Sequence, residues 1–481
     1  MESVKRMPRV LLAGANSGCG KTSITCGILK ALVNRGLHIQ SYKCGPDYID
    51  PMLHSHITGR PAYHADPFFL SRFAMRELVS RVSADADCTI FEGATGQDLR
   101  YLVGKDSQDV DFSVTEGVMG YYDGVGISCE KSTWTVSKET GTPTILIFNV
   151  KGMSHTMVPL IKGMIEYQEN PVTGVILNRC SKGMYQLMKP EIEEKLGISV
   201  VGYFPQKEGI YIGSRHLGLM TAAEIDNLDE ILNLLGETAE ECIDIDLLLK
   251  IGQRAEELPK VKRPEVPKKK RARIAVAKDN AFCFYYKENL EILEQLGAEL
   301  CYFSPVNDTH LPEDTDGIYL GGGYPETYRK ELADNISMKQ SICEAAQYGK
   351  PIIAECGGFM YVCDHLIETD DSQEEMLGLI NTDVRMTKRL SMQFGYVTMK
   401  ALYDTAFFKK DTKIRVHEFH YSKADKRGDA CEITKYSGKC WNGLYVKDKI
   451  MAGYPHFYFH NCKEVAKCFV DMAEEASTKR C

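Results

Sequence analysis

One glycine-rich stretch of the chain has residues suited to phosphate chemistry. It reads GANSGCGKT over Gly14–Thr22. Small residues let backbone N–H groups close around phosphate oxygens, and the N-terminus of a following helix adds the positive end of its dipole. We therefore expect Gly18 and Gly20 to form a phosphate loop. Lys21 would reach the β- and γ-phosphates of a nucleotide, and Thr22 would hold Mg²⁺.

One cysteine has the setting of a nucleophile. Cys356 follows the apolar run Pro351–Ala354 and precedes two glycines that open a helix. A sharp turn of this kind exposes the thiol, and we expect the helix N-terminus to lower its pKa. Gly357 and Gly323, the latter in a second glycine loop, are expected to supply backbone N–H donors to an oxyanion.

A thiol nucleophile needs a base, and histidines lie downstream of Cys356. They stand in the stretches VHEFHYS (His417, His420) and AGYPHFYFH (His456, His460). His456 follows an apolar strand, and catalytic side chains in α/β proteins gather at strand ends. We therefore select His456 as the base, with His460 as the alternative.

Two glutamates, Glu92 and Glu116, end apolar runs and begin the same pattern, Glu-Gly-x-x-Gly. A carboxylate at such a strand end can serve as a metal ligand or a catalytic acid. The matching residues over Arg76–Gly96 and Arg100–Gly120 indicate a local tandem duplication rather than coincidence. A sheet has one position beside the phosphate-loop strand, so at most one copy is expected there. The fold of residues 76–99 is left open.

The elements that must position these residues alternate as strands and helices. Apolar strands are expected at Val10–Ala13, Thr142–Val150, Val172–Cys180 and Ile198–Pro205, with helical stretches between them. This order predicts a doubly wound parallel sheet. Lys43 and Asp47 stand where a further strand ends, and we expect Lys43 to bind a phosphate of the nucleotide. Asn178 stands at a strand end where an amide contact to adenine fits.

Composition limits the classes of partner. The 481-residue chain has 44% hydrophobic residues and a net charge of −8, so we expect neither nucleic acid nor membrane as a partner. No apolar run is long enough to span a bilayer. The 17 cysteines form no short-spaced framework, which indicates free thiols in a reducing cytoplasm.

A basic, proline-rich stretch predicts the domain organisation. Residues 246–271 include LPKVKRPEVPKKKR, a composition found in nuclear signals and nucleic-acid patches as well as in linkers. Because a new strand follows directly, we interpret the stretch as a solvated linker. Residues 1–245 and 272–481 are then two α/β domains.

Several motifs together resemble the cobyrinate a,c-diamide synthase family. They occur in order along nearly the whole chain: AGANSGCGKTS, YKCGPDYIDP, TEGVMGYYDG, YLGGGYPE, AECGGFMYV and VHEFHYS. The resemblance implies a P-loop NTPase-like ATP domain similar to dethiobiotin synthetase, joined to a flavodoxin-like class I glutamine amidotransferase domain. It also implies a ligase of cobalamin (vitamin B12) biosynthesis. ATP would phosphorylate the a and c carboxylates of cobyrinate, and ammonia from glutamine would displace the phosphate.

The resemblance also assigns roles to residues. Cys356 becomes the nucleophile and His456 its activating base, while the phosphate and Mg²⁺ groups map onto Gly20, Lys21, Thr22, Asp47 and Glu116. Only the stretch that begins at Glu116 continues into the family's Tyr-Asp-Gly turn. Glu92 is therefore interpreted as a similar residue in an insertion, without the metal-site role. Many class I amidotransferases have a glutamate two residues after the histidine, but this chain has Tyr458 there, which implies a Cys–His dyad.

The tetrapyrrole substrate and the oligomeric state are less constrained. The side chains of His417, Glu418, His420 and Tyr421 would bind the polycarboxylate macrocycle or form a structural strand edge. One alternative is a nickel-sirohydrochlorin a,c-diamide synthase, which shares these motifs. The stretches GPDYIDP and HEFHYS argue against a cobyric acid synthase. The turn at Cys356 argues against a non-enzymatic P-loop partner protein. The oligomeric state is left open, with a homodimer as one option.

Overall fold

The structure is a computed structural model. It describes residues 4–5, 7–83, 110–207, 214–215, 218–219, 225, 227–259, 261, 264–391 and 393–478. The chain divides into two units, Met1–Arg263 and Pro264–Cys481, and each is described by itself. The duplicated segment predicted over residues 76–99 falls largely outside the described residues, as does Glu92. No helix of the described part has the length and apolar character needed to cross a membrane.

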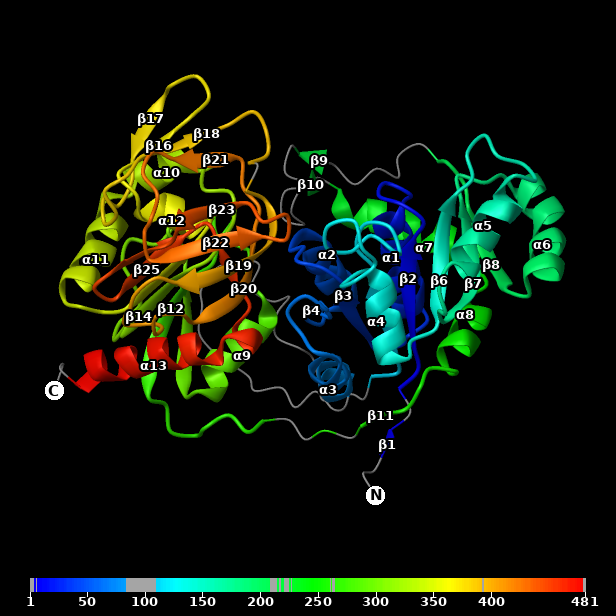
Figure 1. Ribbon diagram of the computed structural model, residues 1–481, viewed down its shortest axis with the longest axis horizontal. Helices are drawn as coiled ribbons and strands as arrows, with labels where there is room; N and C mark the ends of the chain where they lie inside the picture. The colour runs from blue at the N-terminus through cyan, green and yellow to red at the C-terminus, as the bar shows by residue number, and fades with distance from the viewer. Residues whose placement is uncertain are drawn as a thin grey trace. The chain divides into compact units, whose positions relative to one another are not determined.

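Unit 1 is built on a parallel sheet (Figure 1). Within the described residues it has seven strands in the order β4 (Tyr63–His64), β3 (Ile39–Lys43), β5 (Phe112–Glu116), β2 (Arg9–Gly14), β6 (Thr144–Asn149), β7 (Val172–Asn178) and β8 (Ser199–Phe204). The central strands are buried along their whole length, as is expected when helices cover both faces of a parallel sheet. The prediction of a doubly wound parallel sheet is confirmed.

The helices of unit 1 complete its core. They are α1 (Lys21–Asn34), α2 (Ile49–Thr58), α3 (Arg72–Ser83), α4 (Thr133–Thr140), α5 (Met157–Glu166), α6 (Lys182–Leu196), α7 (Leu228–Cys242) and α8 (Ile245–Gly252). Ile24 and Ile28 of α1 pack in one apolar cluster with Leu232 and Leu235 of α7. Short strands β1 (Val4–Lys5) and β11 (Leu258–Pro259) pair with each other, as do β9 (Ser214–Arg215) and β10 (Gly218–Leu219).

The start of the expected linker differs from its prediction. Residues 245–252 form α8, whose Ile245, Leu248 and Ile251 are buried in the core of unit 1. The boundary between the units lies later, after Arg263. The reason is the apolar spacing of IDLLLKIG, which gives α8 a face that must be buried.

Unit 2 has a second sheet with strands β13 (Ala298–Phe303), β12 (Ala272–Ala277), β14 (Gly317–Leu320), β15 (Ile352–Glu355), β25 (Ile450–Gly453) and β24 (Tyr445–Lys447), in that order. All neighbours are parallel except β24 and β25. Side chains alternate along β12, so that Ile274 and Val276 join one apolar cluster and Ala275 and Ala277 join another. The sheet is therefore packed on both faces, as a doubly wound fold requires.

Two helical layers cover this sheet. Helices α9 (Lys287–Gln295) and α13 (Lys463–Thr478) pack on one face, and α13 is the red helix of Figure 1. Helices α11 (Ile336–Gln347) and α12 (Gly357–Val362) pack on the other, and the short helix α10 (Arg329–Asp334) precedes α11. The turn η3 (Phe459–Asn461) joins β26 (His456–Phe457) to α13.

An antiparallel sheet and a mixed sheet complete the described part of unit 2. One contains β23 (Cys440–Gly443), β22 (Cys431–Lys435), β19 (Gly395–Ala401), β20 (Lys413–Glu418) and β26 (His456–Phe457). The other, in which β16 and β18 are parallel, contains β17 (Gln373–Glu375), β16 (His365–Ile367), β18 (Val384–Met386) and β21 (Ser422–Ala424). The first sheet ends at β26, which directly follows β25 of the parallel sheet, so the two sheets meet near His456.

Candidate active sites

The glycine loop of unit 1 joins β2 to α1. Gly20 caps the helix with a φ of 96°, a left-handed conformation that glycine adopts without strain. A Cβ atom at Gly20 would lie 2.2 Å from Asn178 Nδ2, and this amide donates to Cys19 O at 2.6 Å. Asn178 therefore lies against the loop where Gly20 leaves space, and the structure brings these two predicted residues together.

Lys21 lies over the same loop. Its buried ammonium donates to Met119 O at 2.5 Å, in the segment that follows β5. A Cβ atom at Gly14 would lie 2.9 Å from Lys21 Nζ, so the lysine crosses the end of β2. Gly18, the other predicted loop residue, has a φ of 73°, and a Cβ atom added there would meet nothing within 4 Å. The space beside Gly18 is therefore open, whereas the Lys21 side chain packs against Gly14.

Thr22 contacts two carboxylates that stand on different elements. Its hydroxyl donates to Glu116 Oε1 at 3.0 Å and lies 3.3 Å from Asp50 Oδ2. Glu116 ends β5, and Asp50 lies in the first turn of α2. Asp50 was not selected from the sequence, although it stands three residues after the predicted Asp47. Asp47 instead accepts the backbone N–H of Ile49 at 2.9 Å, and its role as a metal ligand stays a prediction.

Lys43 lies among the carboxylates. Its ammonium donates to Asp50 Oδ2 at 2.6 Å, to Glu116 Oε1 at 3.1 Å and to Gly117 O at 3.2 Å. Burial disfavours the charged ammonium, but the surrounding carboxylates outweigh it and raise the pKa of Lys43. The sequence had placed Lys43 on a nucleotide phosphate, whereas here it neutralises acid side chains.

Glu116 is the centre of this cluster. His54, which was also missed from the sequence, lies with its Nε2 2.8 Å from Glu116 Oε2, and both side chains are fully buried. Burial alone would raise the pKa of Glu116, but Lys43 and His54 hold it well below its usual range. The pKa of Asp50 is raised by burial and by the carboxylates of Asp47 and Glu116.

The raised pKa of Asp50 indicates a site that is short of positive charge. Thr22, Asp50 and Glu116 present hard oxygen donors, the kind that Mg²⁺ prefers when phosphate oxygens and water complete its shell. The described residues contain no cluster of three His, Cys, Asp or Glu side chains arranged for a metal alone. The residues present therefore fit a magnesium ion that arrives with a nucleotide better than a permanently bound one.

The thiol of unit 2 stands on a strained turn. Cys356 has a φ of 49° and a ψ of −98° between β15 and α12, a backbone conformation that is uncommon for a residue with a side chain. Its N–H donates to Gly453 O at 2.8 Å, which fixes the turn to β25. A Cβ atom at Gly358 would lie 2.2 Å from Leu320 O, so only glycine permits this approach. The sharp turn expected from the glycines is present.

The two residues predicted as oxyanion donors are neighbours. A Cβ atom at Gly357 would lie 3.0 Å from the backbone nitrogen of Gly323. Gly323 itself packs so closely that its own Cβ would lie 2.0 Å from Ala281 O. The glycine loop after β14 and the start of α12 are therefore in contact beside Cys356.

The thiol differs from the prediction in its acidity. Burial raises the pKa of Cys356, and the negative charge of Glu326 adds to this effect. The N–H of Gly357 acts in the opposite direction but is outweighed. The expected lowering by a helix N-terminus is wrong for this state, because α12 has only six residues and the thiol is removed from water. A base must therefore take the proton before the sulfur can attack.

His456 has the properties of such a base. It follows β25, and Cys356 follows β15, the parallel neighbour of β25. Burial, assisted by His420, lowers the pKa of His456 to about 3, so its imidazole is unprotonated, as an acceptor of the thiol proton must be, and the same burial weakens it as a base. A Cβ atom at Gly322 would lie 2.6 Å from His456 Cε1, which places the ring against the oxyanion loop. His460, the alternative base, lies in the turn η3 instead.

The segment VHEFHYS lies beside this centre. Cys356 Sγ is 3.8 Å from Phe419 O, and His417 pairs with His456 across β20 and β26. His417 is buried, as are Glu418 and His420. These three side chains expose little surface, which gives little support to the prediction that they contact a macrocycle. Their burial places them around the thiol centre, and Tyr421, the fourth predicted residue, is partly exposed.

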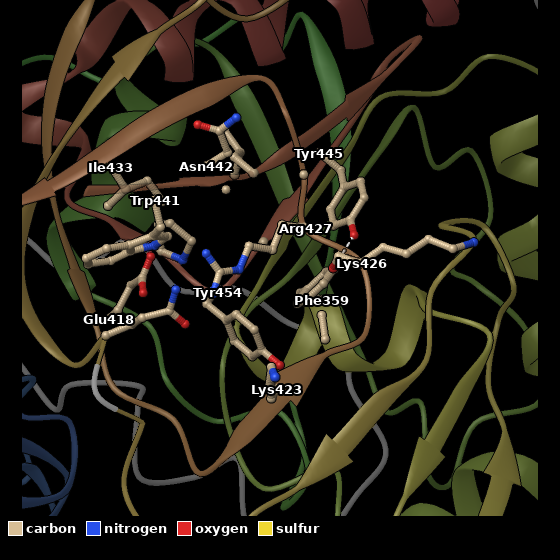
Figure 2. Close-up of a pocket in the computed structure, with 17 residues that line it drawn as sticks. Phe359, Glu418, Lys423, Lys426, Arg427, Ile433, Trp441, Asn442, Tyr445 and Tyr454 are labelled. Carbon is tan, nitrogen blue, oxygen red and sulfur yellow. Dashed lines mark hydrogen bonds between the residues drawn. The ribbon is translucent and has the colours of Figure 1, made fainter. Parts of the chain in front are cut away.

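A pocket of unit 2 borders the same segments (Figure 2). Its lining includes Phe359 of α12, Glu418 of β20 and Tyr454, which directly follows β25. Figure 2 shows the guanidinium of Arg427 and the indole of Trp441 on the side of Glu418. Burial raises the pKa of Glu418, while His420 and the Trp441 side chain offset part of that effect. The pocket therefore borders both α12, the helix that follows Cys356, and β25, the strand that precedes His456.

Comparison with known proteins gives matches to both units. A model described as a CobQ/CobB/MinD/ParA nucleotide binding domain matches residues 10–217, and a CobB/CobQ-like glutamine amidotransferase domain matches residues 273–464. Three similar curated relatives are named cobyrinate a,c-diamide synthase. The one from Clostridium tetani is 38% identical over 97% of this chain and 100% of its own. Those from Priestia megaterium and Listeria monocytogenes are 36% and 39% identical, over 98% and 94% of this chain and 98% and 97% of theirs.

Proposed function

This chain belongs to the cobyrinate a,c-diamide synthase family, and from that premise we propose that it converts the a and c carboxylates of cobyrinate to amides in cobalamin biosynthesis. It is an ATP-dependent carbon–nitrogen ligase with a glutamine amidotransferase domain. ATP and glutamine are its co-substrates, and the tetrapyrrole is the acceptor in the proposal.

The observation that carries the proposal is that the chain holds two centres with separate chemistry. Unit 1 has a phosphate loop beside Thr22, Asp50 and Glu116. Unit 2 has a thiol on a strained turn beside the strand of a neutral histidine. Carboxylate activation by ATP needs the first centre, and release of ammonia from glutamine needs the second.

The centre in unit 1 would activate a carboxylate. A free carboxylate is a poor electrophile because it has no leaving group. In the proposed step, a substrate carboxylate oxygen attacks the γ-phosphorus of ATP, ADP leaves, and an acyl phosphate forms. Lys21 would offset the negative charge on the transferred phosphoryl group, and the loop N–H groups would hold the phosphates in place. Asn178, which lies against the loop, would meet the adenine side of the nucleotide.

Mg²⁺ is the second proposed component of this centre. Thr22, Asp50 and Glu116 would hold it, with Asp47 as the further candidate from the sequence. When bound, the ion supplies charge neutralisation on the β- and γ-phosphates. Lys43 and His54 keep Glu116 ionised and in one orientation, which is what a metal-binding carboxylate requires.

The centre in unit 2 would release ammonia. His456 takes the proton from Cys356 Sγ, and the thiolate attacks the side-chain carbonyl of glutamine. The resulting oxyanion is stabilised by backbone N–H groups at Gly323 and Gly357. The proton passes from His456 to the leaving nitrogen, ammonia departs, and water hydrolyses the thioester to glutamate. Ammonia then attacks the acyl carbon of the phosphorylated carboxylate, and phosphate leaves.

Mass spectrometry tests the proposed function. The protein is incubated with ATP, Mg²⁺, glutamine and cobyrinate, and in parallel with nickel-sirohydrochlorin. We expect two acid-to-amide conversions on cobyrinate, with release of ADP, phosphate and glutamate. Conversion of nickel-sirohydrochlorin alone would assign the chain to the alternative substrate, and conversion of neither would contradict the proposal.

A further inference from the structure

A buried glutamate lies next to the proposed base. Glu355 is the last residue of β15 and directly precedes Cys356. Its Oε2 lies 4.0 Å from His456 Nδ1, and both side chains are 2% exposed.

The carboxylate is held by two further donors. Tyr319 donates its hydroxyl to Glu355 Oε2 at 3.1 Å, and the N–H of Phe457 donates to Glu355 Oε1 at 3.2 Å. Because Phe457 follows His456 directly, the second bond ties the backbone of the histidine to the strand of the nucleophile. The carboxylate therefore has a fixed position on the Nδ1 side of the imidazole.

Burial of a carboxylate at this position is costly and calls for a physical reason. An ionised carboxylate loses much of its hydration free energy when it is removed from water. Burial raises the pKa of Glu355 to about 8, and the bonds from Phe457 and Tyr319 offset only part of the effect. Burying an apolar side chain, like the others of β15, would cost less free energy at this position. A role in stability alone therefore does not account for the glutamate.

We propose that Glu355 is the positioning residue for His456, and this inference rests on the proposed glutaminase function of unit 2. When His456 takes the proton from Cys356 Sγ at Nε2, the imidazolium carries a proton at Nδ1 that faces Glu355. The carboxylate holds this tautomer and stabilises the positive charge, as an acid does in a catalytic triad. Tyr458, two residues after the histidine, has no carboxylate. Glu355, on the strand that leads to the nucleophile, would supply that carboxylate instead.

Other titratable groups face this pair and bear on its pH dependence. They are Tyr285, Tyr319, Cys356, Cys462, His417 and His420. Burial raises the pKa values of both tyrosines and both thiols and lowers that of His417 to about 3. We therefore expect an ionisation near pH 8 in the glutaminase reaction, and we assign it to Glu355.

The first experiment compares Glu355→Gln with wild type in the full-length protein. Glutamate release and ammonia-dependent amidation are measured between pH 6 and 9.5. We expect glutamine-dependent kcat to fall about 100-fold or more while the KM for glutamine changes less than about threefold. Ammonia-dependent amidation stays within about threefold of wild type, because it does not use the thiol centre. The ionisation near pH 8 should be absent from the variant.

Three variants separate positioning from structure. Glu355→Asp keeps the acid and should give a kcat between those of Glu355→Gln and wild type. Tyr319→Phe removes one donor and keeps the carboxylate, so it should lose far less activity than Glu355→Gln. Glu375→Gln removes an exposed charge from the same unit and is the matched control.

The results that would overturn the inference are specific. Glu355→Gln with wild-type kcat and an unchanged pH profile would do so, as would Glu355→Asp as inactive as Glu355→Gln. If Glu355→Gln does not fold, Glu355→Asp decides: a lowered kcat with normal ammonia-dependent activity supports the inference, and wild-type kcat contradicts it. Absence of glutamate release by the wild-type protein would instead count against the proposed function.

Discussion

Lys43 Nζ lies 2.6 Å from Asp50 Oδ2 in the interior of unit 1, and both side chains are almost fully buried. The same ammonium reaches Glu116 at 3.1 Å. One lysine thus faces two carboxylates beside the phosphate loop, and the excess negative charge is what a nucleotide-bound magnesium ion would offset. This relationship, rather than any single motif, defines the centre of unit 1.

Replacing Asp50 should show whether it takes part in this centre. We expect Asp50→Asn to lower ATP-dependent amidation on the order of 100-fold and to raise the Mg²⁺ concentration needed for half-maximal rate. Asp47→Asn is the matched variant, because Asp47 bonds to Ile49 N rather than to Thr22. A magnesium titration of ADP formation measures both. A larger defect for Asp47→Asn would return the ligand role to Asp47.

The two Glu-Gly-x-x-Gly glutamates should differ in function. Glu116→Gln removes a charge that Lys43, His54 and Thr22 all contact, so we expect ATP-dependent amidation to fall about 100-fold or more. Glu92→Gln should leave the rate near that of wild type. Steady-state rates at saturating ATP and glutamine compare the two variants. The reverse order of effects would assign the site to Glu92.

Acid should destabilise unit 2 through its buried histidines. The pKa values of His417 and His456 are both lowered to about 3 by burial, whereas an unfolded histidine titrates near about 6.5. The unfolded state therefore binds more protons as pH falls from 6.5 toward 3, and stability falls with it. Each histidine contributes at most about 1.4 kcal/mol per pH unit in that range.

Thermal melting between pH 4.5 and 7.5 measures this effect. His417→Gln should make the midpoint of unit 2 unfolding less dependent on pH. His310→Gln, which replaces an exposed histidine of the same unit, is the control and should leave the slope unchanged. Equal slopes in all three proteins would show that burial of His417 is not coupled to acid stability.

Two glycines of unit 2 should respond differently to alanine. A Cβ atom at Gly358 would lie 2.2 Å from Leu320 O, so Gly358→Ala must move the helix that follows Cys356. We expect glutaminase activity to fall about 100-fold, because small displacements of a nucleophile are costly. Gly349→Ala has open space and a φ of 73°, so it should cost about 1 kcal/mol of stability and leave activity intact. Similar glutaminase rates for both variants would contradict this interpretation of the turn.

Local patterns allowed a large part of the fold and part of both sites to be predicted. Glycine spacing indicated the phosphate loop and the Cys356 turn, because these depend on neighbouring residues. Partnerships set by tertiary contacts were not predicted: Asp50 of α2 shares Thr22 and Lys43 with Glu116, His54 of α2 contacts Glu116, and Glu355 at the end of β15 faces His456. The acidity of Cys356 was predicted in the wrong direction, because a short helix does not outweigh burial.

The division of labour between the two centres is the central claim, and Cys356→Ala tests it most directly. Amidation of cobyrinate is measured with glutamine and, separately, with a concentrated ammonium salt at pH 8.5. We expect Cys356→Ala to lose glutamine-dependent amidation and glutamate release while its ammonia-dependent rate stays within about threefold of wild type. Loss of both activities in a folded variant, or retention of glutamine-dependent turnover, would contradict this division.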